Sequence, residues 1–585
     1  MTARSARWLA PILSISVLLC CVKALALPGF YVGKNASKRS SHATFVVVMN
    51  KGEQSVVSIM PDYDGPFEPF ALALAVPSDV TLDRIVTLRR EYVDRIDQLS
   101  APRFHEFWEE DPCDPDKPLQ EWERDLHVST SGDNFLGGSA NLGGTKKVPK
   151  EMLLSMKTET KQGEYTFMVP EGETSFLDFA KGRGWLFTPE MEKAVAEYQG
   201  KGWKFVLGEV DPNRIELIGG ERAQMSPIRF WTNQPFRTVP ARLGMLSASG
   251  PQELFVFTID PEKHFVPKNY EVAYPPTNVT VDFVVKERMG EFFAGMHDLW
   301  LAKHPKTWWL EFAWSSDGCG QPCPNEPLLI NEILTLGADI FEQGVPDEDA
   351  HPKPPPMTDA DKANLKMMQD EAKPADRLKV KKQFEEDRKE LARRRGVLDR
   401  NHYILTRLHH RVSEETFPTD VELAPANGGL QGGTQIPTGA KGDIPIDVKP
   451  GDAERMQTRY LFFHPWKGMQ QCEKPERYRW SKPPRTYRGL RKTWVVEDLA
   501  RKSRTQIKPA DVVRTALPEF GLTGEPPKAA DAGADAGLEG GTTKSGCHCS
   551  VPGARNRAAG SALSALALLG GFAFAFRRRS ARRQK

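Results

Sequence analysis

Residues 44–60 read TFVVVMNKGEQSVVSIM, and this stretch decides the fold class of the chain. Residues 44–49 and 55–60 are two runs rich in β-branched side chains, and a break containing Gly52 separates them. This pattern predicts a β-hairpin. A third strand is expected over residues 70–76, where an apolar run stops at Pro77.

The residues beyond this strand indicate helices that pack on a sheet. Apolar side chains recur at helical spacing from Leu82 to Leu99, which predicts an amphipathic helix. Strands are then expected over residues 165–169, 203–207, 254–259 and 279–285, and helices over residues 174–181 and 189–198. Strands with attached helices, rather than alternating βαβ units, favour an α+β fold with β-rich, largely antiparallel sheets and peripheral helices.

The N-terminal residues have the pattern of a signal peptide. Arg4 and Arg7 precede an apolar run over residues 8–22, and Ala24 and Ala26 form the small-x-small pattern that signal peptidase recognises. We therefore expect cleavage after residue 26. Cleavage as a lipoprotein before Cys20 or Cys21 is the alternative, and both interpretations imply export.

The C-terminal residues predict one transmembrane helix. The run 558–576 contains no charged residue and is about long enough to cross a bilayer. Arg577, Arg578 and Arg579 follow it, and the positive-inside bias places them on the cytoplasmic side. Cys547 and Cys549 precede the run.

The order of cysteine, weakly apolar helix and arginine cluster resembles the MYXO-CTERM sorting tail of myxobacterial surface proteins. The resemblance covers residues 545–585 and implies that a sorting protease in the membrane cuts near Cys547 or Cys549. The body would then pass to the cell surface. A plain tail anchor is the alternative. Zinc binding by Cys547, His548 and Cys549 is disfavoured, because closed zinc sites need four ligands.

About 520 residues remain between the two ends, more than one compact core usually holds. The expected organisation is a signal peptide (1–26), an N-terminal β-rich part (27–128), a Gly/Ser linker (129–149), a second α+β part (150–345), a charged helical insertion (346–400), a C-terminal part of the body (401–520), a linker (521–546) and the tail (547–585). The net charge of +2 gives no electrostatic footprint for nucleic acid.

The insertion begins rich in proline and becomes dense in both signs of charge. Glu385 with Lys389, and Glu390 with Arg394, have the favourable four-residue spacing of a solvated helix. A partner-binding coiled coil is the alternative, but sustained heptads are missing.

Four cysteines lie between the signal peptide and the tail: Cys113, Cys319, Cys323 and Cys472. In an oxidising compartment, an even number suggests two disulfides. Cys319 and Cys323 are the natural local pair, which leaves Cys113 for Cys472. Zinc binding and redox chemistry stay open, although the Cys319–Cys323 spacing exceeds that of a thioredoxin-type site by one residue.

The histidines give no catalytic pattern. His409 and His410 are adjacent on an expected strand, so their side chains face opposite ways and cannot both bind one metal. His464 lies among aromatic residues, where a packed, hydrogen-bonded ring is expected, and Arg407 is a candidate to pair with Asp420. The sequence contains none of the common hydrolase, phosphate-loop, zinc-protease or EF-hand motifs. No catalytic residue, cofactor or metal ligand is predicted.

Several short motifs, in their order, resemble the exported bacterial family called domain of unknown function 2330 (DUF2330). They are residues 27–33, 75–77, 226–228, 240–243, 319–323 and 406–409, together with Trp185 ahead of the helix that contains Tyr198. The resemblance implies a fold and export but no reaction. The chain departs from the family at Leu27 and Pro28, where members often carry a cysteine, and in the insertion.

Two functions from different classes remain. The first is a non-enzymatic envelope protein, anchored at the membrane or surface, whose body binds an unknown partner or polymer. The second is an extracellular hydrolase whose acid and base are dispersed along the sequence.

Overall fold

The computed structural model describes residues 27–114, 159–215, 217–218, 222–247, 250–286, 288–316, 327–439, 443–481 and 507–524. All of them belong to the first of two compact units, residues 1–527 and 528–585. Five sequence predictions lie outside the described residues: the signal peptide with Ala24 and Ala26, the linker 129–149, the Cys319–Cys323 pair, the linker 521–546 beyond residue 524, and the tail with Cys547, Cys549 and Arg577–Arg579. Within the described residues, no helix has the length and apolarity needed to span a membrane.

The predicted hairpin at residues 44–60 is confirmed and forms the middle of the largest sheet. Strands β2 (Ala43–Lys51) and β3 (Gln54–Tyr63) pair antiparallel, and Gly52 takes a positive φ of 59° in the tight turn. On its other side, β2 pairs in parallel with β14 (Gln252–Asp260). The sheet continues antiparallel through β19 (Ile404–Val412) to β18 (Thr307–Ser315).

Eight further short strands extend this sheet to thirteen: β5 (Ile85–Thr87), β10 (Leu217–Ile218), β11 (Arg222–Gln224), β12 (Ile228–Thr232), β16 (Glu271–Ala273), β21 (Gly429–Gly432), β22 (Lys449–Gly451) and β23 (Arg455–Gln457). A five-stranded antiparallel sheet has the order β1 (Gly29–Gly33), β4 (Phe70–Pro77), β9 (Trp203–Val210), β8 (Tyr165–Met168) and β7 (Glu159–Gln162).

Two smaller sheets complete the described strands. One has the order β13 (Thr238–Val239), β20 (Val421–Pro425) and β15 (Phe265–Pro267). The other has the order β17 (Val279–Thr280), β24 (Arg459–His464), β6 (Arg103–Glu109) and β25 (Trp480–Ser481). Most strand pairs are antiparallel, so the α+β class with largely antiparallel sheets is confirmed.

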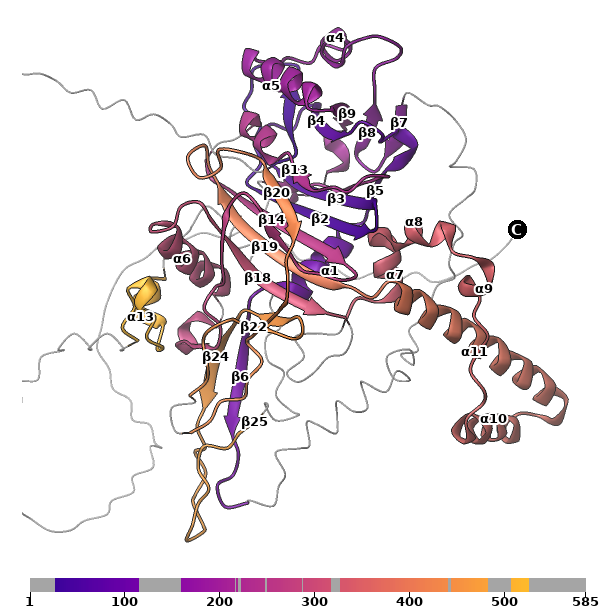
Figure 1. Cartoon of the computed structure of the whole chain (residues 1–585), viewed down its shortest axis with the longest axis vertical. Helices are drawn as coiled ribbons and strands as arrows, with labels where there is room; N and C mark the ends of the chain where they lie inside the picture. Colours follow the sequence, from indigo (N-terminus) through magenta and orange to yellow (C-terminus); the bar gives the residue numbers. More distant parts are fainter. Residues whose placement is uncertain are drawn as a thin grey trace, which may run out of the picture. The chain divides into compact units, whose positions relative to one another are not determined.

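The two largest sheets lie face to face between helices (Figure 1). Side chains of β4 and β9 meet those of β2, β3 and β14 in one core cluster. Helices α4 (Phe176–Gly182) and α5 (Pro189–Gly200) cover the outer face of the five-stranded sheet. Helices α1 (Glu91–Ser100) and α6 (Met289–Leu301) cover the outer face of the large sheet.

Two predicted elements are wrong over part of their length. The helix expected from Leu82 to Leu99 is α1 only from Glu91; residues 82–84 form a 3-10 turn, and residues 85–87 form β5 because they pair with β12. The strand expected over residues 279–285 ends at Thr280. There the Asp282 carboxylate accepts a hydrogen bond from the Val284 N–H, which begins a 3-10 turn over Phe283–Val285.

The insertion is helical, as its charge pattern predicted. It contains α9 (Asp347–Ala350), α10 (Asp359–Glu371) and α11 (Arg377–Arg400), and α10 and α11 project away from the sheets (Figure 1). Arg394 pairs with Glu390 as expected, whereas Lys389 pairs with Glu386 instead of Glu385. Short helices α7 (Ile330–Ile333) and α8 (Asp339–Phe341) precede the insertion, and α13 (Pro509–Val512) lies near the end of the described chain.

Candidate functional site

Strand β19 places three polar side chains inside the core. Arg407, His409 and Arg411 occupy alternate positions, so they share the face of the sheet that α1 and α6 cover. His410 points to the opposite face, where its ring stacks with Trp308. The prediction that His409 and His410 face opposite ways is confirmed.

Two glutamates meet His409 from the neighbouring strands. Glu253 on β14 lies opposite Arg411, beside the Phe255–His409 pair. Glu311 lies at a β-bulge in β18, where the register with β19 shifts between Leu310 and Phe312. Glu311 lies two residues from Trp309, which pairs with His409, so strand alternation places its side chain on the face of His409. The Glu311 carbonyl accepts two hydrogen bonds from Thr458.

Both ring nitrogens of His409 contact carboxylates. Nδ1 lies 2.6 Å from Glu311 Oε1, and Nε2 lies 2.9 Å from Glu253 Oε2. All three side chains are fully buried. His409 therefore bridges two acidic groups in the core, and its ring is fixed by both ends and by stacking on Phe255 at 4.2 Å.

Arginines satisfy the remaining carboxylate oxygens. Arg407 Nε donates to Glu311 Oε2 at 2.6 Å, and its Nη1 donates to Asp97 of α1 at 2.5 Å. Arg411 Nε donates to Glu253 Oε1 at 2.8 Å, and its Nη1 donates to Asp298 of α6. These charge-assisted bonds tie both covering helices to the sheet.

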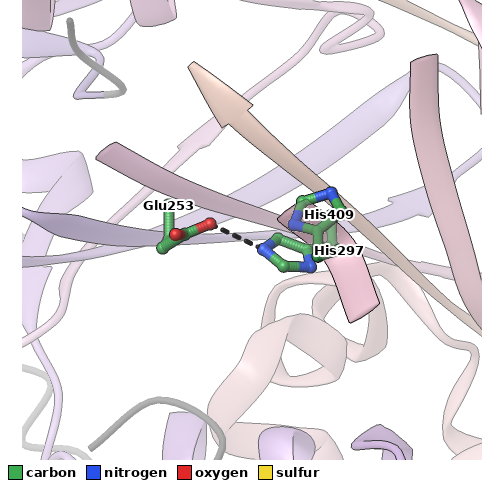
Figure 2. Close-up of side chains that lie close together, drawn as sticks. All are labelled: Glu253, His297 and His409. Carbon is green, nitrogen blue, oxygen red and sulfur yellow. Dashed lines mark hydrogen bonds and ion pairs between the residues drawn. The ribbon is translucent and has the colours of Figure 1, made fainter. Parts of the chain in front are cut away.

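His297 on α6 completes the cluster (Figure 2). Its ring lies 4.3 Å from that of His409 and 4.6 Å from that of Trp309, measured between centroids. The residue is fully buried, yet neither ring nitrogen has a hydrogen-bond partner among the residues that the structure describes. Glu253, His297 and His409 each offer one ligand atom, and these atoms lie within 4.8 Å of one another.

Burial and neighbouring charge move the pKa values of the three histidines in different directions. Burial lowers the pKa of His409, but Glu311 and Glu253 raise it more, so the net pKa lies above the usual value. Burial holds the pKa of His297 well below its usual range. It also lowers the pKa of His410 to about 4. His409 is thus the one of these three that favours the charged form.

The sequence analysis missed this cluster and placed Arg407 wrongly. Arg407 pairs with Asp97 and Glu311, whereas Asp420 accepts hydrogen bonds from the Tyr198 hydroxyl and the Arg242 backbone N–H. A signal was present in β19: arginine, histidine and arginine alternate in a strand whose other residues are mostly apolar. Such a strand needs carboxylates opposite it.

The predicted disulfide between Cys113 and Cys472 is present. The sulfur atoms lie 2.11 Å apart and the Cα atoms 5.4 Å apart, although 359 residues separate them in sequence. The same region is held by Glu109, whose carboxylate accepts hydrogen bonds from Arg477 and from the backbone N–H groups of Trp466 and Tyr478.

An aromatic row crosses the sheet of β6 and β24. The His464 ring stacks on Trp108 at 3.8 Å and hydrogen-bonds Glu106 at 2.7 Å, as expected for a packed histidine. Phe283 meets His464 at 5.0 Å and Phe462 at 4.9 Å. Phe283 is 46% exposed. We call Phe283, Phe462, His464 and Trp108 the aromatic row.

Comparison with known proteins places the chain in a family. The model of a family described as an uncharacterized protein conserved in bacteria (DUF2330) matches residues 22–424. The chain therefore belongs to the DUF2330 family, as its motifs suggested. No curated protein and no solved structure matches it.

Proposed function

We propose that the chain is an exported, non-enzymatic protein of the bacterial envelope whose body binds a partner or polymer. Signal peptidase would remove residues 1–26. The tail would hold the protein in the inner membrane until a sorting protease transfers it to the envelope or outer surface. This order of events accounts for both ends of the sequence.

The Cys113–Cys472 disulfide is the observation that carries the proposal. Structural disulfides persist in oxidising compartments and are rare in the reducing cytosol. The pair joins the residues after β6 to the segment after β24, so it belongs to the body rather than to either targeting segment. A disulfide within the body is therefore expected if the body folds in an oxidising compartment outside the cytosol.

The aromatic row supports a binding role. Phe283 and Val284 are 46% and 56% exposed, and they follow directly from the turn at Asp282. Clustered exposed aromatic and aliphatic side chains are typical of interaction surfaces. His464 stacks on Trp108 and Phe462 stacks on Phe283, and these contacts hold the row in one conformation before a partner arrives.

Two measurements test this function. Mass analysis of the protein from membranes should give Leu27 as its first residue, and fractionation should place it in the envelope. Purified body should co-sediment with peptidoglycan sacculi or with outer-membrane vesicles from the producing cell. The double substitution Phe283→Ala with Val284→Ser should weaken that binding at least tenfold, about 1.4 kcal/mol.

Leu378→Ser provides the matched control, because Leu378 is also exposed but lies on α11, away from the row. Equal binding by the row variant and the control would contradict a role for the row. Full retention in the cytosol would contradict the proposal as a whole.

A small pocket favours the hydrolase as the second candidate. Lys51, Asp260 and Arg400 are among its lining residues. Burial lowers the pKa of Lys51 and raises the pKa of Asp260, so both shifts are toward the neutral range in which general acids and bases work. Turnover of ester, peptide or glycoside substrates that disappears in both Lys51→Met and Asp260→Asn would favour this candidate over the binding protein.

A further inference from the structure

We propose that Glu253, His297 and His409 bind one divalent transition-metal ion, and that the ion is zinc. Two imidazole nitrogens and one carboxylate oxygen form a donor set that zinc takes in proteins, usually with a fourth ligand such as water. Magnesium and calcium prefer oxygen ligands throughout, so this donor set disfavours them. The inference is independent of the envelope function proposed above.

The positions of the donor atoms fit a single ion after a small adjustment. Zinc bonds of about 2.1 Å in a tetrahedral arrangement place ligand atoms about 3.4 Å apart. His409 Nε2 and Glu253 Oε2 lie 2.9 Å apart, and all three donor atoms lie within 4.8 Å. The His297 ring therefore needs only a local movement toward the other two.

Neighbouring side chains already hold two of the ligands in the orientation that a metal requires. Glu311 contacts Nδ1 of His409, which directs Nε2 toward Glu253. Arg411 occupies Oε1 of Glu253 and leaves Oε2 on the side of His409. A carboxylate behind a ligating histidine is the usual outer shell of a zinc site. When the ion binds, the proton shared by Nε2 and Oε2 leaves to solvent.

His297 is the independent observation that points to a ligand. A buried polar group without a hydrogen bond is costly, and both nitrogens of this fully buried ring lack partners among the described residues. A phenylalanine at this position would pack against Trp309 equally well. A metal bond to one nitrogen explains why a histidine follows the apolar run Phe292–Met296 of α6.

The ion would join three elements that are distant in sequence. Glu253 comes from β14, His409 from β19 and His297 from α6. All three ligands are buried beneath the helix, and the fourth position that a three-ligand set leaves open would hold a water molecule. Metal binding should fasten α6 to the large sheet, and chelation should loosen that contact.

The test uses the full mature chain, produced in medium with added zinc. Elemental analysis should find about one zinc per chain, and removal with a chelator should lower the melting temperature until zinc is returned. Cobalt added to the metal-free protein should give the visible absorption of a tetrahedral nitrogen and oxygen site.

His297→Phe keeps the ring that packs on Trp309 but removes its nitrogens, so it should lose both the zinc and the chelator-dependent melting shift. His304→Phe is the matched control, because His304 stacks on Trp300 just beyond the end of α6. It should keep one zinc per chain. If His297→Phe does not fold, Glu253→Gln should show the same loss of metal.

Two results would overturn the site. One is wild-type protein without zinc that also fails to bind zinc or cobalt in titration. The other is a zinc content in His297→Phe or Glu253→Gln equal to that of the wild type, which would place the ion elsewhere in the chain.

Discussion

Arg407 Nε donates to Glu311 Oε2 over 2.6 Å, and neither side chain is exposed to solvent. Arg407→Met should destabilise the fold by about 3–5 kcal/mol, because Glu311 and Asp97 would lose a buried partner. Arg407→Met combined with Glu311→Gln should cost less than the sum of the two single changes. Urea unfolding measures all three variants.

Arg393→Met is the control for this comparison, since Arg393 pairs with Glu390 on the solvated helix α11. Exposed pairs contribute about 0–1 kcal/mol, so the control should unfold near the wild-type urea concentration. Additive costs at Arg407 and Glu311 would show that the two residues act independently, contrary to their contact.

The Cys113–Cys472 disulfide should stabilise the folded body. Replacing both cysteines by serine should lower the free energy of unfolding by about 2–5 kcal/mol, because the cross-link restricts the unfolded chain. Reduction of the wild type with dithiothreitol should give the same loss. A reductant effect of similar size in the double-serine variant would show that another disulfide is responsible.

Stability near Glu109 should depend on pH. Burial raises the pKa of Glu109, but hydrogen bonds from Arg477, Tyr478 and Trp466 lower it more, so the net pKa in the folded state lies below the usual value. This stabilisation is complete above the unfolded pKa of about 4.3 and is lost as the pH falls through the folded pKa.

Glu109→Gln should therefore reduce stability at neutral pH and make it fall less steeply below about pH 5. Glu476→Gln is the control, because Glu476 is largely exposed in the same segment. Urea midpoints measured from neutral to acidic pH give the comparison. Parallel curves for the wild type and Glu109→Gln would exclude this contribution.

The helical insertion should be dispensable for folding. Val397 is the one buried residue of α11, and none of α10 is buried. The insertion nevertheless joins the body at Arg400, which pairs with Glu342 and whose carbonyl accepts a hydrogen bond from Lys51. A deletion should therefore keep the residues on either side of the junction.

Pro352 lies against Gly396, where an added Cβ would be 3.3 Å from the proline ring. A short Gly-Ser link in place of residues 353–395 should thus close without strain. The shortened protein should unfold within about 0.5 kcal/mol of the wild type. A loss of several kcal/mol, or insoluble expression, would show that the insertion supports the core.

The sorting interpretation predicts a separate effect at the tail. Changing both Cys547 and Cys549 to serine should leave export intact but prevent transfer to the surface, with the tail retained. Mass analysis and surface labelling of cells measure both results. Normal surface display with a processed tail would favour a plain membrane anchor.

Local patterns predicted elements whose pairing is also local. The hairpin at residues 44–60 could be recognised because its two strands are neighbours in sequence. Residues 82–87 fit a helical period, but pairing of Ile85 and Val86 with β12 draws them into a sheet. Pairing with a distant strand overrode the local helical preference of these residues. The pattern of one segment alone carries no information about such a partner.

The candidate site was harder to predict because its parts are distant. The strand pattern placed His409 and His410 on opposite faces, but Glu253 lies 156 residues from His409 and Glu311 lies 98 residues from it. Glu311 also lies in a one-residue bulge of β18, where the register with β19 shifts. Neither the pairing of β14 with β19 nor the bulge can be read from hydrophobic periodicity.

The bond between Cys113 and Cys472 makes most of the body a covalent ring. A protease that cuts the backbone once anywhere between these cysteines opens the ring but leaves both pieces attached. The residues before Cys113, which include β1 to β5, would thus stay linked to the residues after Cys472 until a second cut is made. A single cut in this ring would therefore not separate the N-terminal part of the body from the residues after Cys472.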